Sequence, residues 1–495
     1  MPSSRRKSVE FGCPDVTDQK CLPVMGGHLI DDKNMFTKET YVSRRNRLKK
    51  QVGSGLIVLL GNEQSSMNYK DNWYHFRQDS TFLYFFGIDR AGLVAVIDVE
   101  ANAEVIFGEE LTPDDIVWMG PQKSIREQAS EIGVGLTKPL ATLDSYFQHA
   151  LAKKREIHFL PPYRPENLLK LSSWLQTAPA SIKSMASVPL IKAVVAQRSI
   201  KTPEEVAEIE KGINTTVEMQ IAAATLARAG MTEAELAGQL QSIAIKGGGN
   251  LAFPTILTVN GQILHNHYSP TVLQEGQLVL VDCGAASATH YSGDLTRTFP
   301  VSSSFSAKQK EMYAVMMTAY EQAVAMLKPG VKYKDVHLQA CTQLAEGLKH
   351  LGLMKGDAQE AVAQGAHALF FPCGLGHMLG LDTHDMEDLG EEYVGYAEDQ
   401  TKSTQFGLKS LRLARALEPG FVLTVEPGLY FNPDLIELWS AEKVHADFIN
   451  YEQVAGYKDF GGIRIEEDFL ITPEGSRVLG NPLPRNMEEF RQFAR

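Results

Sequence analysis

Two aspartates at the ends of apolar segments constrain this chain more than any of its other features. Leu278–Val281 is a run of β-forming apolar residues that stops at Asp282. Strand-forming sequence resumes over 290–299 and contains Asp294. Because aspartate is a poor strand residue, its placement there requires a compensating interaction. The alternative interpretation is a pair of carboxylates that cap turns.

Three later segments present more polar side chains at bends or strand ends. A glycine-rich bend presents His377, and an apolar strand ends on Glu426, where a Pro-Gly pair turns the chain. In the third segment Arg464 and Glu466 alternate with isoleucines, so both polar side chains point to one face. The chain thus offers two aspartates, one histidine and two glutamates as a five-ligand set.

This set predicts a metal centre. Buried carboxylates repel one another and lose hydration, so four together are costly unless a cation neutralises them. Two divalent ions roughly 3.5–4 Å apart, bridged by two carboxylates and a water, would do so and would lower the pKa of that water toward about 7. Four oxygen donors and one nitrogen donor favour Mn²⁺, while Co²⁺, Fe²⁺ or Zn²⁺ can compete.

The order of the motifs VDCGA, GDLTRTFP, GLGHMLGLDTHD, TVEPGLYF and GGIRIEED resembles that of the pita-bread metallopeptidases, and among them the proline-specific branch of prolidase and aminopeptidase P. The resemblance covers nearly the whole chain. It implies that Asp282 chelates one metal, Asp294 and Glu466 bridge both, and His377 and Glu426 complete the second. It also implies catalysis by a metal-bridging hydroxide, with Glu426 counted among the catalytic residues.

Two histidines outside the ligand set are candidates for catalysis. His265 and His267 fall on opposite sides of a segment expected to be extended, so only one can face the site. The resemblance selects His265, as proton donor or oxyanion stabiliser near the scissile carbonyl. It also assigns His384, seven residues after His377, to hydrogen bonding with the scissile region of the substrate.

One position departs from the family pattern. The family usually carries a histidine four residues before the metal-binding one, and this chain has Cys373 there. A thiol cannot act as a cationic donor at neutral pH, so we expect the binding of substrate at Cys373 to be weakened or rearranged. Alternatively, metal and nearby histidines could lower the pKa of the thiol and make it sensitive to oxidation or mercurials.

Three further side chains are expected to contact the substrate. Arg412, fourteen residues before Glu426, stands where prolidases carry the arginine that binds the C-terminal carboxylate of a dipeptide. The alternative is a structural ion pair of Arg412 or Arg415. Arg464, on the site-facing side of its segment, is the second. Trp118 matches a tryptophan that in prolidases reaches the active site of the neighbouring subunit, and the alternative is a tryptophan in the core.

The resemblance implies hydrolysis of the Xaa-Pro bond with release of the N-terminal residue. Because that bond has no amide N–H, an enzyme that cleaves it needs a dedicated shallow apolar pocket. Our first choice is an Xaa-Pro dipeptidase (prolidase), because of Arg412 and the segment YFNPDLIELW. The alternative is an Xaa-Pro aminopeptidase (aminopeptidase P), which acts on longer peptides. The N-terminal domain of that enzyme is resembled equally well by the segment HFRQDSTFLYFFGI. A third hypothesis, a non-catalytic pita-bread binding protein, is opposed by the presence of all five ligands.

Charge and cysteine usage exclude several partners. A formal net charge of −12 opposes binding to nucleic acid or anionic membranes, and no apolar run approaches the ~20 residues of a membrane span. The five scattered cysteines include no Cys-x-x-Cys pair, which indicates a reduced, cytoplasmic protein. The basic N-terminus lacks the apolar core of a secretory signal. The expected partners are peptides with proline second and a second copy of the chain in a homodimer.

Patterns in the first half predict a helix and several strands. Helix-compatible sequence spans 40–51, and GLIVLLG is typical of a buried strand. An aromatic-rich run from Trp73 and the apolar run Leu93–Val99 flank a turn, as in a pair of strands. Core packing, rather than a stacking site for ligand rings, is the favoured role of these aromatic residues.

Four helices are expected in the second half. Capping boxes at Thr202 and Thr232 open the first two, and the first has an apolar stripe with i, i+3/i+4 spacing. The others are expected over 307–327 and 334–350. Long helices that alternate with strand pairs predict an α+β layer, in which helices back a curved sheet whose inner face holds the metals.

A chain of 495 residues is too long for one core, so we expect two domains and an arm. Residues 1–38 are expected to form an irregular arm, which could pack across a partner subunit. Residues 39–192 are assigned to a creatinase-type (aminopeptidase P-like) α/β domain. Residues 193–495 are assigned to a pita-bread (creatinase/aminopeptidase-like) catalytic domain, which makes the fold class α+β.

Overall fold

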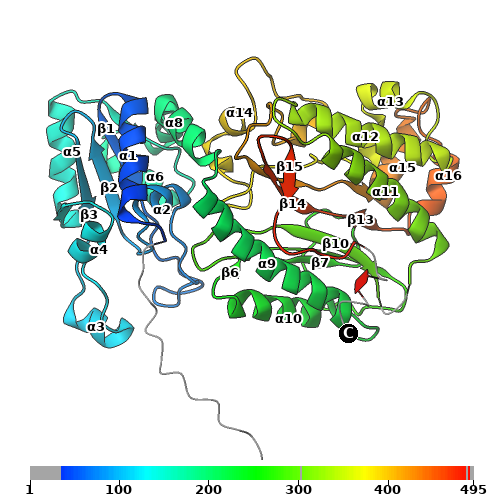
Figure 1. The fold of residues 1–495 in the computed structure, drawn as a ribbon, viewed down its shortest axis with the longest axis horizontal. Helices are drawn as coiled ribbons and strands as arrows, with labels where there is room; N and C mark the ends of the chain where they lie inside the picture. The colour runs from blue at the N-terminus through cyan, green and yellow to red at the C-terminus, as the bar shows by residue number, and fades with distance from the viewer. Residues whose placement is uncertain (1–34, 302–303, 486–488, 491–495) are drawn as a thin grey trace, which may run out of the picture.

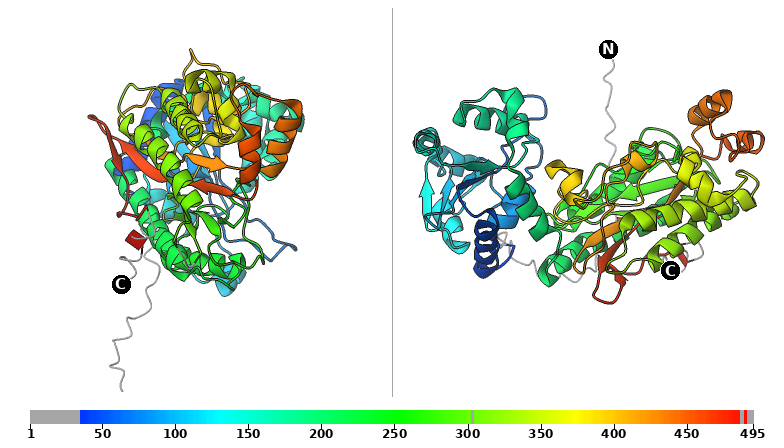
Figure 2. Two further views of the ribbon diagram at one scale, coloured as in Figure 1. Left: turned by 90° about the vertical axis from the view of Figure 1, so that its right-hand side faces the viewer. Right: turned by 90° about the horizontal axis from the view of Figure 1, so that it is seen from above.

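The computed structural model describes residues 35–301, 304–485 and 489–490 (Figure 1). A smaller N-terminal part and a larger C-terminal part lie side by side along the longest axis of the molecule (Figures 1 and 2). Most of the expected arm, residues 1–34, lies outside the described residues. No helix within the described ranges is long and apolar enough to cross a membrane.

A five-stranded mixed sheet forms the centre of the N-terminal part. In chain order its elements are α1 Lys38–Val52, β1 Leu56–Leu60, α2 Ser80–Phe86, β2 Val94–Asp98, β3 Ala103–Phe107, α3 Pro113–Met119, α4 Ile125–Glu131, β4 Leu136–Lys138, α5 Leu143–Ala152, β5 Ile157–Phe159, α6 Pro165–Trp174, α7 Pro179–Ile182 and α8 Val188–Arg198. The strand order is β4-β3-β2-β1-β5. β2 is antiparallel to both β1 and β3, whereas β5 is parallel to β1 and β4 is parallel to β3.

The prediction of a strand for the aromatic-rich run is wrong, because Ser80–Phe86 forms helix α2. Asp79 caps this helix by accepting a hydrogen bond from the backbone N–H of Phe82. Gly87 ends it with a φ of 63°, and a side chain there would collide with the ring of Tyr41. β2 therefore pairs with β1 and β3 instead. The aromatic residues of α2 are buried, which confirms their place in the core.

The C-terminal part carries several short sheets and two pairs of long helices. In chain order its elements are α9 Pro203–Leu226, α10 Glu233–Lys246, β6 Asn250–Leu251, β7 Ile256–Thr258, β8 Leu278–Cys283, β9 Ala285–Ala286, β10 Leu295–Pro300, α11 Ala307–Ala325, α12 Tyr333–His350, α13 Ala358–Gln364, α14 Glu391–Val394, β11 Val422–Val425, β12 Gly428–Tyr430, α15 Pro433–Glu442, α16 Tyr451–Val454, β13 Gly462–Arg464, β14 Glu467–Ile471 and β15 Ser476–Val478. The sheets have the orders β10-β8-β7, β11-β14-β15, β12-β13 and β6-β9.

All four helices expected in this part are confirmed. Capping boxes at Thr202 and Thr232 open α9 and α10, and α11 and α12 fall where periodicity places them. The strands lie between the α9–α10 pair and the α11–α12 pair in Figure 1. α9 contacts β8, β9 and β10, while α11 contacts β11, β12 and β13. The expected boundary at 192/193 falls within α8, where the two parts meet.

Candidate metal centre and active site

A cavity of about 1130 Å³ opens between the two parts and contains the predicted site. Residues 74–78 line it from the N-terminal part, and strand ends and loops line it from the C-terminal part. The predicted site residues on its wall are Asp282, Asp294, His377, Glu426, Glu466, His265, His384, Arg412, Arg464 and Cys373. Trp118 does not line it. The fold thus brings together ten of the eleven residues selected from the sequence.

Strand pairing brings the five candidate ligands to one place. Asp282 lies in β8, whose antiparallel partner β10 begins directly after Asp294. Glu426 directly follows β11, and Glu466 directly precedes the antiparallel partner of that strand, β14. His377 lies in the loop between η3 (Ala366–Leu369) and η4 (Glu387–Leu389). The pair β8–β10 therefore presents two carboxylates, Asp282 and Asp294, and the pair β11–β14 presents the other two, Glu426 and Glu466.

The candidate ligands are close enough to share metal ions. One ligand atom each of Asp294, His377 and Glu466 lies within 4.8 Å of the others. Nε2 of His377 is 3.5 Å from Oδ2 of Asp294 and 3.8 Å from Oε1 of Glu426. Nδ1 of His377 is 3.0 Å from the backbone carbonyl of Met378. A carbonyl only accepts, so we assign the ring proton to Nδ1, which leaves the Nε2 lone pair facing the carboxylates.

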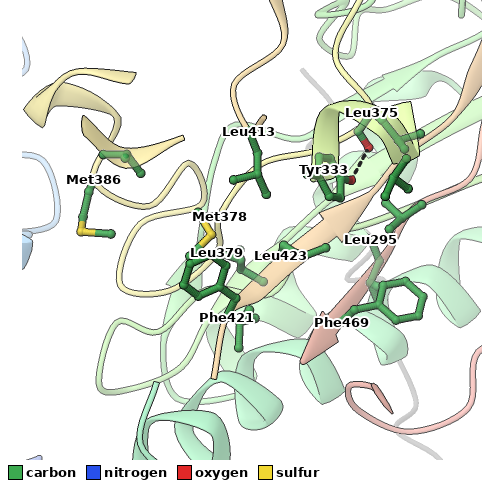
Figure 3. Packing of buried hydrophobic residues seen from close by; sticks show 14 of the residues in the cluster. Leu295, Tyr333, Leu375, Met378, Leu379, Met386, Leu413, Phe421, Leu423 and Phe469 are labelled. Atoms are coloured by element: carbon green, nitrogen blue, oxygen red, sulfur yellow. Dashed lines mark hydrogen bonds between the residues drawn. The ribbon is translucent and has the colours of Figure 1, made fainter. Parts of the chain in front are cut away.

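Hydrophobic packing holds the His377 loop against the strands. Figure 3 shows Leu375 and Met378 of this loop in the same buried cluster as Leu423 of β11. The single hydroxyl hydrogen of Tyr333, at the start of α12, is shared between the carbonyl of Thr424, 2.6 Å from the hydroxyl oxygen, and that of Leu375, 3.3 Å from it. The loop backbone is therefore tied both to β11 and to α12.

The electrostatics of the cluster call for a cation. Burial raises the pKa of Asp294 and of Glu466 well above the ordinary range, and neighbouring carboxylates raise both further. Burial also raises the pKa of Glu426. Oδ1 of Asp282 and Oδ1 of Asp294 are buried without a hydrogen-bond partner among the described residues. Unpaired carboxylate oxygens beside one imidazole fit divalent first-row ions, because a cation supplies the missing partner.

Sequence reasoning missed the residues that orient these ligands. Thr296 donates from Oγ1 to Oε2 of Glu466 over 2.7 Å, and Asp468 accepts from the backbone N–H of Asp294 over 3.0 Å. Both are fully buried. Thr296 stands two residues after Asp294, so strand alternation was the signal that placed it on the same face. Asp468 carries the same signal relative to Glu466.

Arg464 faces the site as expected, but its hydrogen bonds go to the protein. Nη2 donates to Oδ2 of Asp282 over 2.5 Å, and Nη1 donates to the hydroxyl of Tyr430 over 2.9 Å. Nε is 3.3 Å from Oγ1 of Thr296. These contacts support a role in positioning Asp282. Direct binding of substrate by Arg464 stays a prediction.

The histidines are arranged differently from the expectation in one respect. Both His265 and His267 line the cavity, because His265 lies in a turn and strand alternation does not apply to it. Burial lowers the pKa of His265, with Arg464 as the next cause. The ring centroids of His384 and His377 are 4.4 Å apart, and Nδ1 of His384 is 2.5 Å from Oε2 of Glu387. Burial, then His377, lowers the pKa of His384 to about 4.

Arg412 lies on the cavity wall and also forms an ion pair, whereas its binding of a substrate carboxylate stays a prediction. Its side chain is half-buried on the cavity wall, and its Nε is 3.4 Å from Oε1 of Glu387. Glu387 therefore contacts both Arg412 and His384, and was missed by sequence reasoning. Contact with His384, then with Arg412, lowers the pKa of Glu387 to about 2 against the effect of burial.

Cys373 and Trp118 have contrasting surroundings. Burial, then Glu426, raises the pKa of the Cys373 thiol to about 12 in the metal-free protein, and a pKa lowered by bound metal stays a prediction. Trp118 is 86% exposed on α3, a helix without buried residues, so the alternative of a core tryptophan is wrong. Val117 beside it is 79% exposed.

A buried ionic network that the sequence did not reveal fixes the segment around His384. Oδ1 of Asp385 accepts from Nη2 of Arg198 over 2.7 Å, and Oδ2 accepts from Nζ of Lys201 over 2.8 Å. Although burial raises the pKa of Asp385, Lys201 and Arg198 lower it overall. Arg198 and Lys201 lie at the junction of the two parts, so this junction also positions the His384 segment.

Two family models match the chain. One is described as metallopeptidase family M24 and matches residues 207–473, and the other is described as aminopeptidase P, N-terminal domain, and matches residues 41–158. An Xaa-Pro dipeptidase of Homo sapiens is 31% identical over 461 residues, which cover 89% of this chain and 88% of the relative. An Xaa-Pro aminopeptidase of Escherichia coli (strain K12) is 32% identical over 477 residues, which cover 92% and 97%.

Solved structures of aminopeptidase P are similar over nearly the whole chain. A variant of the Escherichia coli enzyme in complex with substrate has a TM-score of 0.76 at 27% identity, covering 92% of this chain and 98% of that one. Aminopeptidase PepP of Pseudomonas aeruginosa has a TM-score of 0.76 at 26% identity, covering 93% and 98%. These similarities confirm the expected α+β fold with its pita-bread C-terminal part.

Proposed function

The chain belongs to metallopeptidase family M24, and on that premise we propose that it hydrolyses the Xaa-Pro bond of short peptides, with Xaa-Pro dipeptides preferred. It is a metal-dependent Xaa-Pro peptidase, since relatives at similar identity are an Xaa-Pro dipeptidase and an Xaa-Pro aminopeptidase. The observation that carries the chemistry is the buried group of Asp294, His377 and Glu466, whose ligand atoms lie within 4.8 Å.

In this proposal Asp282, Asp294, His377, Glu426 and Glu466 hold two divalent ions. Bound there, such ions supply Lewis-acid activation of water and of the scissile carbonyl. Mn²⁺ is the proposed ion, because four of the five ligands are oxygen donors. Thr296 and Arg464 keep Glu466 and Asp282 in place through the hydrogen bonds described above.

His265 and His384 act on the substrate in this proposal. Burial and Arg464 favour a neutral imidazole on His265, which can still donate one N–H to the scissile carbonyl oxygen. His384 is also neutral, because burial and the nearby His377 lower its pKa to about 4, and Glu387 fixes its ring through Nδ1. The mechanism therefore uses both rings as neutral hydrogen-bond partners rather than as imidazolium ions.

The choice of dipeptides rests on Arg412. Its guanidinium is half-buried on the cavity wall, where it can bind the free carboxylate of an Xaa-Pro dipeptide. The alternative, an Xaa-Pro aminopeptidase that takes longer peptides, is favoured by a specific observation: Glu387 already pairs with Arg412 at 3.4 Å. The similarity to aminopeptidase P structures supports the same alternative.

Two further proposals concern the assembly and its location. We propose a homodimer in which Trp118 of each subunit lies at the active site of the other, because Trp118 and Val117 expose apolar surface that a partner would cover. Cytoplasmic location is proposed from the five scattered cysteines of the sequence, which include no Cys-x-x-Cys pair.

The test is a direct comparison of two substrates. An Xaa-Pro dipeptide and the matching Xaa-Pro-Yaa tripeptide are assayed with added Mn²⁺ on the full chain. A higher kcat/KM for the dipeptide supports the first choice, and a higher value for the tripeptide supports the alternative. Failure to hydrolyse either peptide in the metal-loaded protein would reject both.

A further inference from the structure

A second cluster of metal-binding side chains lies outside the catalytic cavity. His337 and Cys341 are four residues apart on α12 and therefore face the same side of the helix. His367, in η3, approaches them, so that one ligand atom of each residue lies within 4.8 Å of the others. All three side chains are buried, and none of them lines the catalytic cavity.

Three of the four imidazole nitrogens of this cluster have no hydrogen-bond partner of normal geometry among the described residues. Nδ1 of His337 and both ring nitrogens of His367 are buried without a hydrogen bond of normal geometry to any described residue. The backbone of Val362 raises the pKa of His367, but this effect is weaker than the lowering by burial and by His445. Burial lowers the pKa of His337 to about 3 and that of His367 to about 4. Both rings are therefore neutral and carry a free lone pair in the interior.

The geometry suits a metal ion. Sγ of Cys341 is 3.5 Å from Nε2 of His337. Ligands about 2.3 Å (sulfur) and 2.0–2.1 Å (nitrogen) from a tetrahedral zinc ion are themselves about 3.5 Å apart. An S–H···N hydrogen bond within the helix accounts for that distance equally well, but it gives neither ring nitrogen of His367 a hydrogen bond of normal geometry.

We propose that His337, Cys341 and His367 form a buried site for a soft transition-metal ion, Zn²⁺ or Cu⁺, separate from the carboxylate centre. Thiolate and imidazole ligands are the ones that these ions prefer, whereas Mn²⁺ prefers oxygen. Binding displaces the thiol proton of Cys341 to solvent, so the cluster supplies one negative charge. The site is then neutral with Cu⁺ and carries one positive charge with Zn²⁺.

An ion at this site would connect α12 to the segment that leads into the metal-ligand loop. His367 lies ten residues before His377, and α12 already holds that loop through the Tyr333 hydroxyl. The ion is therefore structural: none of its three ligands lines the catalytic cavity, and it adds a second connection between α12 and the loop, beside the contact of Tyr333 with Leu375 that Figure 3 shows.

The experiment measures a third metal ion and its thiolate ligand. Because the site is buried, the full chain is expressed in minimal medium with Co²⁺, so that the ion is present while the chain folds. Co²⁺ bound to a thiolate shows an intense near-ultraviolet charge-transfer band that oxygen and nitrogen ligands do not produce. We expect three ions per chain and this band in the wild type, and two ions without the band in Cys341→Ser.

The matched control is Cys373→Ser, which removes the thiol on the wall of the catalytic cavity. This variant should keep the band and the third ion. His367→Gln should lose the third ion as Cys341→Ser does, and it keeps the test decisive if the serine variant does not fold. Two ions without a band in the wild type, or a band that disappears in Cys373→Ser, would overturn the proposal.

Native mass spectrometry identifies the natural ion. Protein from medium without added cobalt, with Mn²⁺ at the catalytic centre, should carry one extra Zn²⁺ or Cu⁺ in the wild type and none in Cys341→Ser. Elemental analysis of the same samples then distinguishes zinc from copper. Absence of any extra ion in wild-type protein would overturn the proposal.

Discussion

Nη2 of Arg464 lies 2.5 Å from Oδ2 of Asp282, and both side chains are buried at the wall of the metal centre. The same guanidinium also contacts Tyr430 and Thr296, so its planar fork is held from three sides. Oδ1 of Asp282 has no such partner among the described residues. Arg464 thus leaves one oxygen of Asp282 free for a metal while it fixes the other.

Replacing Arg464 with lysine should therefore weaken metal binding without removing the charge. A lysine keeps one positive charge but cannot contact Asp282, Tyr430 and Thr296 together. We expect Arg464→Lys to lose about 10–100-fold in metal affinity, as is typical when an outer-shell partner is changed. Competition with a fluorescent chelator measures the metal affinity. The control is Arg477→Lys, because Arg477 is an exposed arginine that pairs with Glu210. Unchanged affinity in Arg464→Lys would assign Arg464 to the substrate alone.

Removing one charge from the ligand group should remove metal and activity together. Asp294→Asn or Glu466→Gln replaces an anionic ligand with a neutral amide, so we expect fewer than two ions per chain and no Xaa-Pro hydrolysis. Metal analysis and a peptide assay on the same samples measure both. Glu474→Gln, at an exposed position, should retain full metal content and turnover. Two bound ions and full turnover in either ligand variant would rule this site out.

The raised pKa values of Asp294 and Glu466 predict how the metal-free protein responds to pH. A carboxyl whose pKa is higher in the folded state keeps its proton there while the unfolded state loses it. These two groups therefore favour folding at low pH, and their contribution is lost as pH rises above about 4, the ordinary carboxyl range. Bound metal offsets the cost of burying these two carboxylates in their ionised form.

Thermal unfolding measured with chelator and with Mn²⁺ from pH 4.5 to about 8 tests this sign. The difference in Tm between the two conditions should widen as pH rises. In the double variant Asp294→Asn, Glu466→Gln, the metal-free protein should lose less stability over the same range than the wild type. A wild-type difference that narrows with pH would contradict the raised values.

Cys373→His restores the residue that the family usually carries. The position lines the cavity, so an imidazole there can contact substrate. We expect folding to be preserved and kcat/KM for Xaa-Pro peptides to rise or stay unchanged, with Cys373→Ser as the size-matched control. A loss of tenfold or more, equal to about 1.4 kcal/mol of transition-state stabilisation, would mean that the site is built around the thiol.

Arg412→Ala distinguishes the two candidate activities. If the guanidinium binds a dipeptide carboxylate, KM for dipeptides should rise strongly, because a charge-assisted hydrogen bond of roughly 1.5–3 kcal/mol is lost. Tripeptides should suffer less, since their carboxylate lies one residue further out. An aminopeptidase P would prefer the tripeptide from the outset and respond little to the change.

The contact between Arg412 and Glu387 provides the control for that experiment. Glu387→Gln removes the ion pair at 3.4 Å but keeps the guanidinium. If Arg412 acts only as an ion-pair partner, both variants should lose activity equally on both substrates. A dipeptide-specific loss in Arg412→Ala that Glu387→Gln does not reproduce would assign the carboxylate site to Arg412.

Local patterns predicted the four long helices of the C-terminal part, α9 to α12. The capping boxes at Thr202 and Thr232 are short-range interactions between side chain and backbone, and they start α9 and α10 where the sequence indicates. The error at α2 has a local cause as well. Its apolar residues surround the whole helix, so no periodicity distinguishes it from a buried strand, and only Asp79 and Gly87 mark its ends.

The amino-acid sequence alone determined the identities of the candidate ligands, because carboxylates at strand ends and a histidine in a glycine-rich bend are local features of the chain. It did not determine which groups surround them. Thr296, Asp468 and Glu387 meet the site through contacts far apart in the sequence, as does the network of Asp385 with Arg198 and Lys201. Such contacts depend on how strands and loops pack, and burial then sets the pKa of each group. Only the tertiary structure decided these, because distance and desolvation arise when the chain is folded.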